Sequence, residues 1–221
     1  MKILCGETSS NLCSAAILED FNLIEKIELD NGLTHSETFL PTIHEVIKKS
    51  HVSLDDIDLL VCDIGPGSFT GIRIGIASIK AFSDVQNIPC VGVSSLEVLA
   101  YNIKTDGLIC STINCKNDNC YFALYELKNG IYNILENPTT MAISEVQNLL
   151  ENKYSNSVIH YVGDGIPGKS ESNYLNIVNL GIAGYNKFLL NNKKGEDVFP
   201  LYIKKPQAQI QLENKLKNSN N

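Results

Sequence analysis

A single acidic side chain follows the first apolar segment of the chain. Glu7 ends a predicted strand over residues 2–7 and is followed by Thr8, Ser9 and Ser10. A carboxylate at the end of a strand either holds a water bound to Mg²⁺ or accepts hydrogen bonds from its own turn. Because the sequence shows no second acid that converges on Glu7, the pattern favours the turn and leaves the Mg²⁺ site as the alternative.

A glycine-rich loop joins a buried strand to a helix. Its sequence, Gly-Pro-Gly-Ser-Phe-Thr-Gly over residues 65–71, lies between a predicted strand at 57–64 and a predicted helix at 72–82. Glycines let a ligand approach the backbone, and the first amides of a helix attract anions. No lysine follows the last glycine, so the loop is not a Walker loop. Ser68 or Thr70 is then expected as a helix N-cap, with an anion site as the alternative.

A second glycine-rich segment matches the P-loop pattern. Residues 163–170 read Gly-Asp-Gly-Ile-Pro-Gly-Lys-Ser. A phosphate cradle needs the N-terminal amides of a following helix. Residues 171–179 interleave asparagines with β-branched residues and predict no amphipathic helix. We therefore expect a structural turn at this position.

The histidines and cysteines show no metal-binding spacing. His44 and Glu45 lack the second histidine of an H-E-x-x-H motif. Cys110, Cys115 and Cys120 form C-x4-C-x4-C, which matches no common zinc or iron–sulfur spacing. The cysteines number 7, and such an odd count suits reduced thiols better than a disulfide framework. We expect no metal site and no catalytic residue.

Two similar runs of strands and helices must position these residues. The first run predicts strands at 2–7, 13–18, 23–29, 57–64 and 90–93, and helices from Thr34 to Lys49, at 72–82 and at 95–101. The order restarts at Leu108 with strands near 108–114, 120–127, 130–136 and 158–162, and helices at 144–153 and 181–192. Residues 207–217 predict a polar tail helix, followed by a frayed tip. The sequence therefore predicts an α/β fold of two halves that divide near residues 104–107.

The helix at 72–82 is apolar around most of its circumference. One stripe contains Ile72, Ile76 and Ile79, and a second stripe contains Ile74, Ala77, Ala81 and Val85. Such a helix is either internal or shared with a partner. The pattern alone leaves both interpretations open.

Charge is distributed unevenly along an acidic chain. The formal net charge is −7 and the pI is about 5.1. Residues 1–100 carry a net charge of −8, whereas residues 187–221 carry +4. Such a chain lacks the positive field for unaided nucleic-acid binding, and only its tail is basic. No segment predicts a signal peptide or a membrane span, so we expect a cytoplasmic protein.

Four segments of the first half occur in the order and spacing of a known family. They are MKILCGETS at 1–9, HSETFLP at 35–41, GPGSFTGIRIG at 65–75 and GVSSL at 92–96, with weaker echoes at 162–165 and 200–204. The chain thus resembles the TsaB (YeaZ) family of tRNA threonylcarbamoyladenosine biosynthesis proteins. The resemblance implies an actin-like (ASKHA, RNase H-like) fold of two similar βββαβα halves. These are residues 1–104, with partner-binding helices, and residues 105–221, a degenerate half with a basic tail.

The resemblance also implies a non-catalytic scaffold subunit of the t6A synthesis complex. Its partners would be a TsaD-like transferase and a TsaE-like ATPase, which transfer threonylcarbamoyl from threonylcarbamoyl-AMP to N6 of the adenosine 3′ of the anticodon. No cofactor is then intrinsic to this chain, and ATP and metal are expected on the partner subunits. We expect a homodimer when the chain is alone, tRNA contact only through the complex, and no membrane contact.

The resemblance places the partner interface on the first two long helices and a vestigial nucleotide cleft on the glycine loops. The implied interface residues are His35, Phe39, Leu40, Ile43, Val46, Ile47, Ile72, Ile76, Ile79 and Phe82. The implied cleft residues are Glu7, Thr8, Ser9, Gly65, Gly67, Ser68, Gly163, Asp164 and Gly165. The chain departs from the family pattern at Glu7, where Asp is usual, and at Asn114, Lys116 and Asn119, where the family has two acids and an arginine. An amide supplies neither a base nor negative charge, so these departures argue against intrinsic chemistry.

Two other function classes stay open as alternatives. One is an active actin-like phosphotransferase that uses Glu7, Gly67 and Ser68 around Mg-ATP. The other is a glycoprotease-like peptidase, for which the sequence assembles neither a metal pair nor a nucleophile triad.

Overall fold

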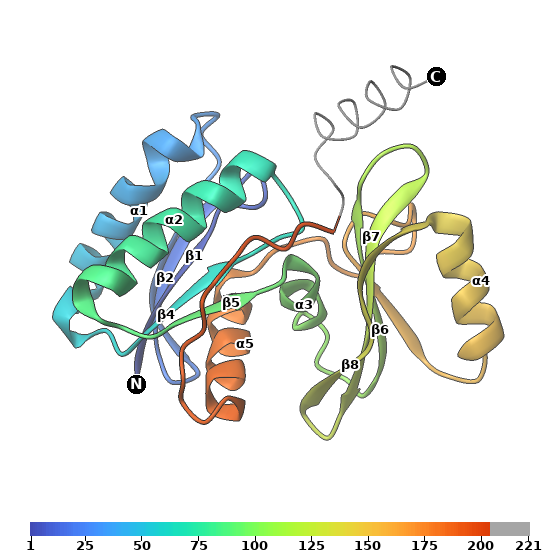
Figure 1. Ribbon diagram of the computed structural model, residues 1–221. Helices are drawn as coiled ribbons and strands as arrows, with labels where there is room; N and C mark the ends of the chain where they lie inside the picture. Colours follow the sequence, from blue (N-terminus) through green and yellow to red (C-terminus); the bar gives the residue numbers. More distant parts are fainter. Residues whose placement is uncertain (204–221) are drawn as a thin grey trace, which may run out of the picture.

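The computed structural model describes residues 1–203, which form two β-sheets with helices packed on both (Figure 1). The first sheet has the strand order β3-β2-β1-β4-β5. Its strands are β1 (Lys2–Glu7), β2 (Cys13–Glu19), β3 (Asn22–Leu29), β4 (Leu59–Asp63) and β5 (Cys90–Val93). The first three strands pair antiparallel, whereas β4 runs parallel to β1 and β5 parallel to β4. The carboxyl ends of β1 and β4 therefore lie side by side.

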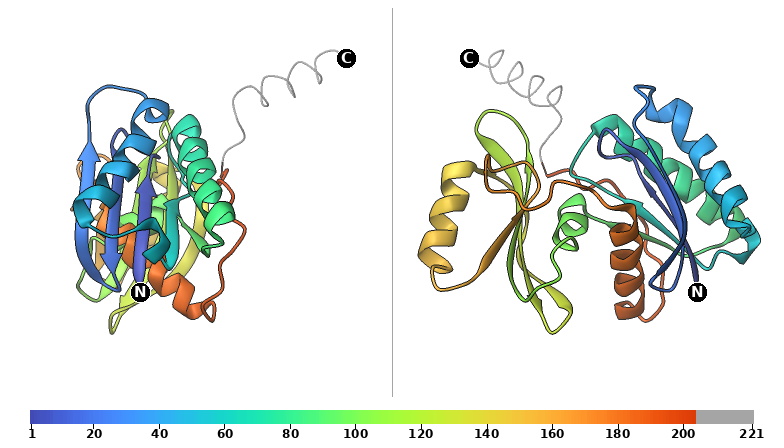
Figure 2. Two further views of the ribbon diagram at one scale, coloured as in Figure 1. Left: turned by 90° about the vertical axis from the view of Figure 1, so that its left-hand side faces the viewer. Right: turned by 180° about the vertical axis from the view of Figure 1, so that it is seen from behind.

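Helices cover both faces of this sheet because its strands are apolar on both faces. Leu4 of β1 packs in one core cluster with α1 (His35–Ser50) and α2 (Phe69–Gln86). Its neighbours Ile3 and Cys5 point to the opposite face and pack in a second cluster with α5 (Ile177–Leu190). Figure 2 shows α1 and α2 on one face of the sheet and α5 on the other.

The second sheet repeats this order without a fifth strand in the described residues. Its strand order is β8-β7-β6-β9. The strands are β6 (Gly107–Asn114), β7 (Asn119–Lys128), β8 (Ile131–Ala142) and β9 (Ile159–Val162). Helix α4 (Ile143–Lys153) packs on one face, and α3 (Ser95–Ala100) lies between the other face and α5. This repeated topology confirms the predicted actin-like fold.

One helix that the sequence places in the second half packs on the sheet of the first half. The last helix, expected at 181–192 in the second half, is α5, and it packs on the first sheet. Small residues allow this contact: a Cβ at Gly184 would lie 2.4 Å from Val61 Cγ1, and one at Gly181 would lie 2.8 Å from Leu18 Cδ1. The glycine spacing of α5 thus matches a sheet surface that the order of elements does not reveal.

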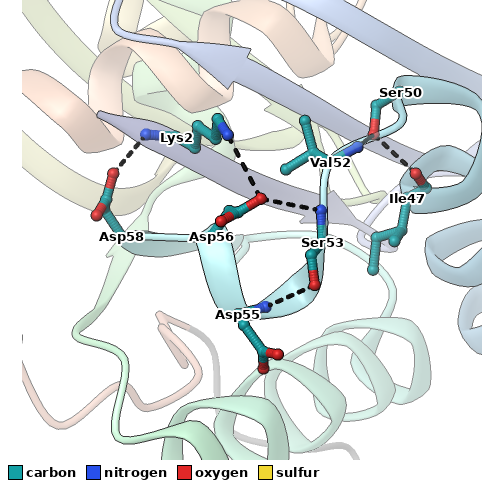
Figure 3. Close-up of polar contacts among 8 residues, drawn as sticks. All are labelled: Lys2, Ile47, Ser50, Val52, Ser53, Asp55, Asp56 and Asp58. Atoms are coloured by element: carbon teal, nitrogen blue, oxygen red, sulfur yellow. Dashed lines mark hydrogen bonds and ion pairs between the residues drawn. The ribbon is translucent and has the colours of Figure 1, made fainter.

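The start of β4 is fixed by polar contacts to the first strand (Figure 3). The amide of Lys2 donates to Asp58 Oδ2 at 2.8 Å, and Lys2 Nζ lies 3.5 Å from Asp56 Oδ2. Asp56 ends a short 3-10 helix, Leu54–Asp56, whose N-cap Ser53 accepts from the amide of Asp55. These contacts join the segment after α1 to β1, so β1 and β4 enter the sheet in register.

Local contacts define the start of α1 and the structure of residues 163–170. Glu37 caps α1 by accepting from the Thr34 amide at 3.1 Å. Pro41 lies inside α1. The P-loop-like segment at 163–170 is followed by no helix until Ile177, which confirms the structural turn. The predicted tail helix at 207–217 lies outside the described residues.

Candidate functional site

Two acidic side chains meet at the carboxyl ends of β1 and β4. Glu7 is fully buried and Asp63 is 2% exposed. The Ser9 hydroxyl joins them, because it lies 2.8 Å from Glu7 Oε1 and 3.1 Å from Asp63 Oδ2. Ser95 Oγ donates to Asp63 Oδ1 at 2.7 Å. The expectation that no second acid converges on Glu7 is therefore wrong. Asp63 ends a strand parallel to β1, and that position is the signal that could have identified it.

The carboxylate of Glu7 is turned back onto its own loop. Oε1 accepts from the amides of Ser9 at 2.5 Å and Ser10 at 2.9 Å, and Oε2 accepts from Ser10 Oγ at 2.9 Å. These bonds confirm the turn interpretation of Glu7. Both oxygens thus accept hydrogen bonds from the loop, and Glu7 is fully buried.

Burial makes both acids harder to ionise. Burial and, after it, the neighbouring Glu7 carboxylate raise the pKa of Asp63 to about 7, against the opposing effect of hydrogen bonds from Gly65, Ser95 and Ser9. Burial also raises the pKa of Glu7, while its bonds from Ser9 and Ser10 oppose the rise. The pair thus forms a hydrogen-bonded unit that holds β1, β4 and α3 together rather than an exposed charge.

A cavity of about 350 Å³ lies between the two halves. It is lined by Ser9, Ser10, Asn11, Leu12, Pro66, Gly67, Leu99, Ile113, Asp164, Asn173, Tyr174 and Leu175. Three of the predicted cleft residues, Ser9, Gly67 and Asp164, are among them. Asp164 is the charged side chain of this lining, and it accepts from the amide of Asn114 at 2.8 Å. Among residues 1–203, the lining includes no basic side chain that could meet a phosphate.

The other predicted cleft residues have structural contacts. Thr8 Oγ1 donates to Gly71 O at 2.7 Å, and Ser68 caps α2 by accepting from the Gly71 amide at 3.2 Å. Glycine is required at Gly163, because its φ is +85° and a Cβ there would lie 1.8 Å from Thr112 O. Gly65 and Gly165 are likewise packed against Ile72 and Thr112. Thr8 thus joins the loop after β1 to the glycine loop at 65–71, and the segment at 163–165 packs against Thr112.

The structure tests whether an actin-like Mg-ATP site fits this cleft. Glu7 would have to give up its bonds to Ser9 and Ser10 to reach a Mg²⁺-bound water. No basic residue from the described part of the chain lines the cavity to meet the phosphates. Within residues 1–203, no group of three or more His, Cys, Asp and Glu side chains is arranged to hold a metal ion. The residues therefore do not fit Mg-ATP.

Most of the predicted interface residues lie in the core of the chain. Helices α1 and α2 contact each other and pack side by side on the first sheet. The side chains that face the sheet and are at most 5% exposed are Phe39, Ile43, Val46, Ile72, Ile76 and Ile79. His35, Ile47 and Phe82 are partly buried, and Leu40 is 52% exposed. The sheet thus buries most of the residues at which the resemblance implies a partner interface.

The second stripe of α2 supplies the outer face instead. Ala77, Ala81 and Val85 are exposed, and Ile74 is partly buried beside them. Val85 is 82% exposed. The sequence pattern contains this stripe, but nothing in it shows which of the two stripes faces the sheet. We call Leu40, Ala77, Ala81 and Val85 the outer face.

The first turn of α1 is bonded to the loop that lines the cavity. His35 Nε2 lies 2.9 Å from the carbonyl oxygen of Ser10, so this nitrogen carries the proton and donates. His35 also packs against α2, because a Cβ at Gly71 would lie 3.0 Å from His35 Cδ2. The loop at residues 8–12 therefore contacts both helices and the cavity.

The amides that replace acids after β6 close a turn. Asn114 Oδ1 accepts from the amide of Lys116 at 2.8 Å, and Asn119 Nδ2 donates to Asn117 O at 2.6 Å. Lys116, Asn117 and Asp118 all have positive φ, a conformation that Asn and Asp tolerate better than most residues. These amides thus have a structural use in the β6–β7 connection.

Comparisons with known proteins were made for the sequence and the fold. A family model described as "TsaD: tRNA N6-adenosine threonylcarbamoyltransferase" matches residues 32–161. The chain is 33% identical over 132 residues to the tRNA threonylcarbamoyladenosine biosynthesis protein TsaB of Bacillus subtilis, which is 59% of this chain and 58% of that protein. It is 32% identical over 136 residues to TsaB of Escherichia coli, with 60% and 58% covered. The matches thus span less than two thirds of these relatives.

Two solved structures share the fold over nearly the whole chain. A protein described as similar to peptidase YeaZ from Pseudomonas aeruginosa has a TM-score of 0.77 at 21% identity, covering 92% of this chain and 99% of that chain. YeaZ from Pseudomonas aeruginosa has a TM-score of 0.74 at 20% identity, covering 91% and 99%. At these identities the likeness concerns the fold alone. Within residues 1–203, no helix is both long and apolar enough to cross a membrane.

Proposed function

Because the chain belongs to the tRNA N6-adenosine threonylcarbamoyltransferase (TsaD) family, and within it to the TsaB (YeaZ) proteins, we propose that it acts in the biosynthesis of threonylcarbamoyladenosine in tRNA. Its role there is that of a non-catalytic subunit that binds and activates a TsaD-like transferase. A TsaE-like ATPase completes the complex, and ATP and metal belong to the partner subunits.

The state of the acid pair supports a non-catalytic role. Glu7 has both oxygens committed to its own turn, and Asp63 is bonded to Ser9 and Ser95 behind the cavity wall. A general base needs a free lone pair within reach of its substrate. Neither carboxylate offers one toward the cavity, so the chemistry of threonylcarbamoyl transfer falls to the partner. This is the observation that carries the proposal.

The outer face of α1 and α2 supports the binding role. Ala77 and Ala81 are one turn apart and small, so another helix can approach α2 closely between them. Leu40 and Val85 add exposed apolar surface on the same side of the sheet. A partner helix, or in its absence a second copy of this chain, buries these side chains. His35 then links the docked helices to the loop at residues 8–12.

The charge of the chain assigns tRNA binding mainly to the complex. Residues 1–100, which contain the outer face, carry −8. An acidic surface repels the phosphate backbone, so partner subunits must supply most of the positive field. The sequence after residue 186 carries +4 and is the segment whose charge suits tRNA.

Reconstitution tests this function. Purified TsaD-like and TsaE-like proteins from the same genome are incubated with unmodified tRNA, ATP and threonylcarbamoyl-AMP, with and without this chain, and t6A is measured by mass spectrometry of the digested nucleosides. We expect modification only when this chain is present, and none from this chain alone. Equal modification without the chain would contradict the activating role.

A further inference from the structure

The exposed side of α2 carries the only arginine in the sequence. The other basic side chains, apart from histidine, are lysines. Arg73 lies near the start of α2. Arginine differs from lysine in presenting a planar fork of five N–H donors that matches a carboxylate. Its side chain is exposed on one of the two helices that carry the outer face.

Two aromatic rings hold the guanidinium of Arg73 in place. Its Nε donates to Tyr202 Oη at 2.6 Å. Its central carbon lies 3.9 Å from the centroid of the Phe69 ring and 5.6 Å from that of Tyr202. The rings themselves are 5.4 Å apart, and both remain partly exposed, at 41% for Phe69 and 45% for Tyr202. The side chain is thus ordered before any partner arrives, which lowers the entropy lost on binding.

The charge of Arg73 is not matched within the described part of the chain. It forms no ion pair there, and the bond from Nε to Tyr202 is its one hydrogen bond among residues 1–203. Asp197, an acid of the segment that leads to Tyr202, pairs with Lys80, the other cation of α2. The four N–H groups on the two terminal nitrogens are therefore left for a group outside these residues.

We propose that Arg73, framed by Phe69 and Tyr202, is a preformed clasp for a carboxylate side chain of the protein that docks on the outer face. This inference rests on the proposed function and names the chemistry that the partner must present. The clasp lies on the same helix as Ala77 and Ala81, so a partner helix that packs on those residues extends to it. An acidic side chain of that helix then accepts two parallel bonds from the fork.

The surroundings favour a carboxylate of a protein over a phosphate of tRNA. A phosphate backbone is bound by several cations together. On α2 the second cation, Lys80, is paired, and the exposed residues of the helix after Arg73, which are Ala77, Ala81, Asp84, Val85 and Gln86, add no further positive charge. Arginine and aromatic residues are enriched among the residues that contribute most to binding at protein interfaces.

A purely structural role makes a different prediction. Arg73 joins α2 to Tyr202, and Leu201 bonds through its amide to Ile64 O, so Arg73 could serve only to fasten this segment. In that case Arg73→Gln and Tyr202→Phe lower the melting temperature of the isolated chain alike and leave the affinity for the partner unchanged. The clasp predicts instead that Arg73→Gln weakens the affinity for the partner and leaves the melting temperature unchanged.

Calorimetric titration of the full chain into the TsaD-like protein tests the clasp. We expect Arg73→Gln to weaken binding by about 10- to 100-fold, as for a lost charged hydrogen bond, with an unchanged melting temperature. Arg73→Lys keeps the charge without the fork and should have an intermediate effect. Lys128→Gln, which removes an exposed charge from β7 in the other half, is the matched control and should bind like the wild type.

Zero-length cross-linking identifies the group that faces position 73. In the complex formed with Arg73→Lys, a carbodiimide should couple the new amine to an Asp or Glu of the TsaD-like protein, and mass spectrometry should find that peptide pair. Wild-type affinity of Arg73→Gln would overturn the proposal. So would an unaltered affinity for the protein combined with weaker tRNA binding by the assembled complex, which would assign Arg73 to a phosphate.

The same titrations separate the clasp from the proposed function. If Ala81→Glu abolishes binding while Arg73→Gln does not alter it, the clasp alone is wrong. If the wild-type chain does not bind the TsaD-like protein, both are wrong.

Discussion

His35 of α1 donates a hydrogen bond of 2.9 Å to the carbonyl of Ser10. This bond joins a helix of the outer face to the loop that lines the cavity and caps Glu7. A shift of α1 on partner binding would therefore reach the loop at residues 8–12 through one contact. The helices that we propose bind a partner are thus joined by this contact to the loop that lines the cavity.

The first prediction concerns this contact. His35→Phe keeps a ring of similar size but removes the donor to Ser10. The loop at residues 8–12 should open more often, and its backbone amides should exchange with deuterium faster than in the wild type. Hydrogen–deuterium exchange read by mass spectrometry measures this, with β7 as the internal control. Unchanged exchange in residues 8–12 would show that the bond does not hold the loop.

The second prediction concerns pH. Asp63 has a pKa of about 7 in the folded chain and the ordinary, lower value when unfolded. Between these values the folded state binds more protons than the unfolded state, so the free energy of unfolding falls as pH rises from about 4 to about 7. Each pKa unit corresponds to about 1.4 kcal/mol. Burial raises the pKa of Glu7 as well, so its contribution has the same sign.

Asp63→Asn removes the share of this dependence that comes from Asp63, whereas Glu7 and Glu97, whose pKa values burial also raises, keep theirs. Asn can keep the bonds from Gly65 and Ser95 on Oδ1 and can donate from Nδ2 to Ser9. The variant should be more stable than the wild type at pH 8, and its stability should vary less between pH 4 and 7. Urea unfolding at several pH values checks this, with the partly exposed Asp55→Asn as control. A wild-type pH profile for Asp63→Asn would show that Asp63 ionises freely in the fold.

The third prediction separates the two stripes of α2. Ile76 is 5% exposed in the core between α2 and the sheet. Ile76→Asp buries a charge and should lower the free energy of unfolding by on the order of 3 kcal/mol. Ala77→Asp, the next residue on the exposed side, should change it by about 0.5 kcal/mol or less. Urea unfolding measures both. Equal effects would contradict the burial of the first stripe.

The fourth prediction concerns Mg-ATP. The described residues that line the cavity include no basic side chain, and Glu7 accepts hydrogen bonds from its own turn. Calorimetric titration of the isolated chain with Mg-ATP should therefore detect no tight binding. Tight binding, together with its loss in Ser68→Ala or Glu7→Gln, would favour the phosphotransferase alternative.

Periodicity and spacing in the sequence predict the helices and strands of this fold more accurately than they predict which of these elements contact each other. The capping box at Thr34 and Glu37 and the repeated order of strands are local patterns, and the structure has both. The position of α5 on the first sheet and the meeting of Asp63 with Glu7 depend on residues distant in sequence. For the same reason the sequence does not show which stripe of α2 is buried. Both stripes are apolar, and packing against the sheet determines which one is buried. The sequence does not reveal the contact between Arg73 and Tyr202 either, because the two residues are 129 positions apart.

The central claim is that the outer face of α1 and α2 binds a TsaD-like transferase. Calorimetric titration of the wild-type chain and of Ala81→Glu into that protein tests it most directly, with melting temperatures to show that both fold. We expect a saturable complex for the wild type and a loss of affinity of at least about 100-fold for Ala81→Glu, because a charge at a close helix contact is both desolvated and sterically excluded. Equal affinity of the two proteins, or no complex with the wild type, would contradict the account.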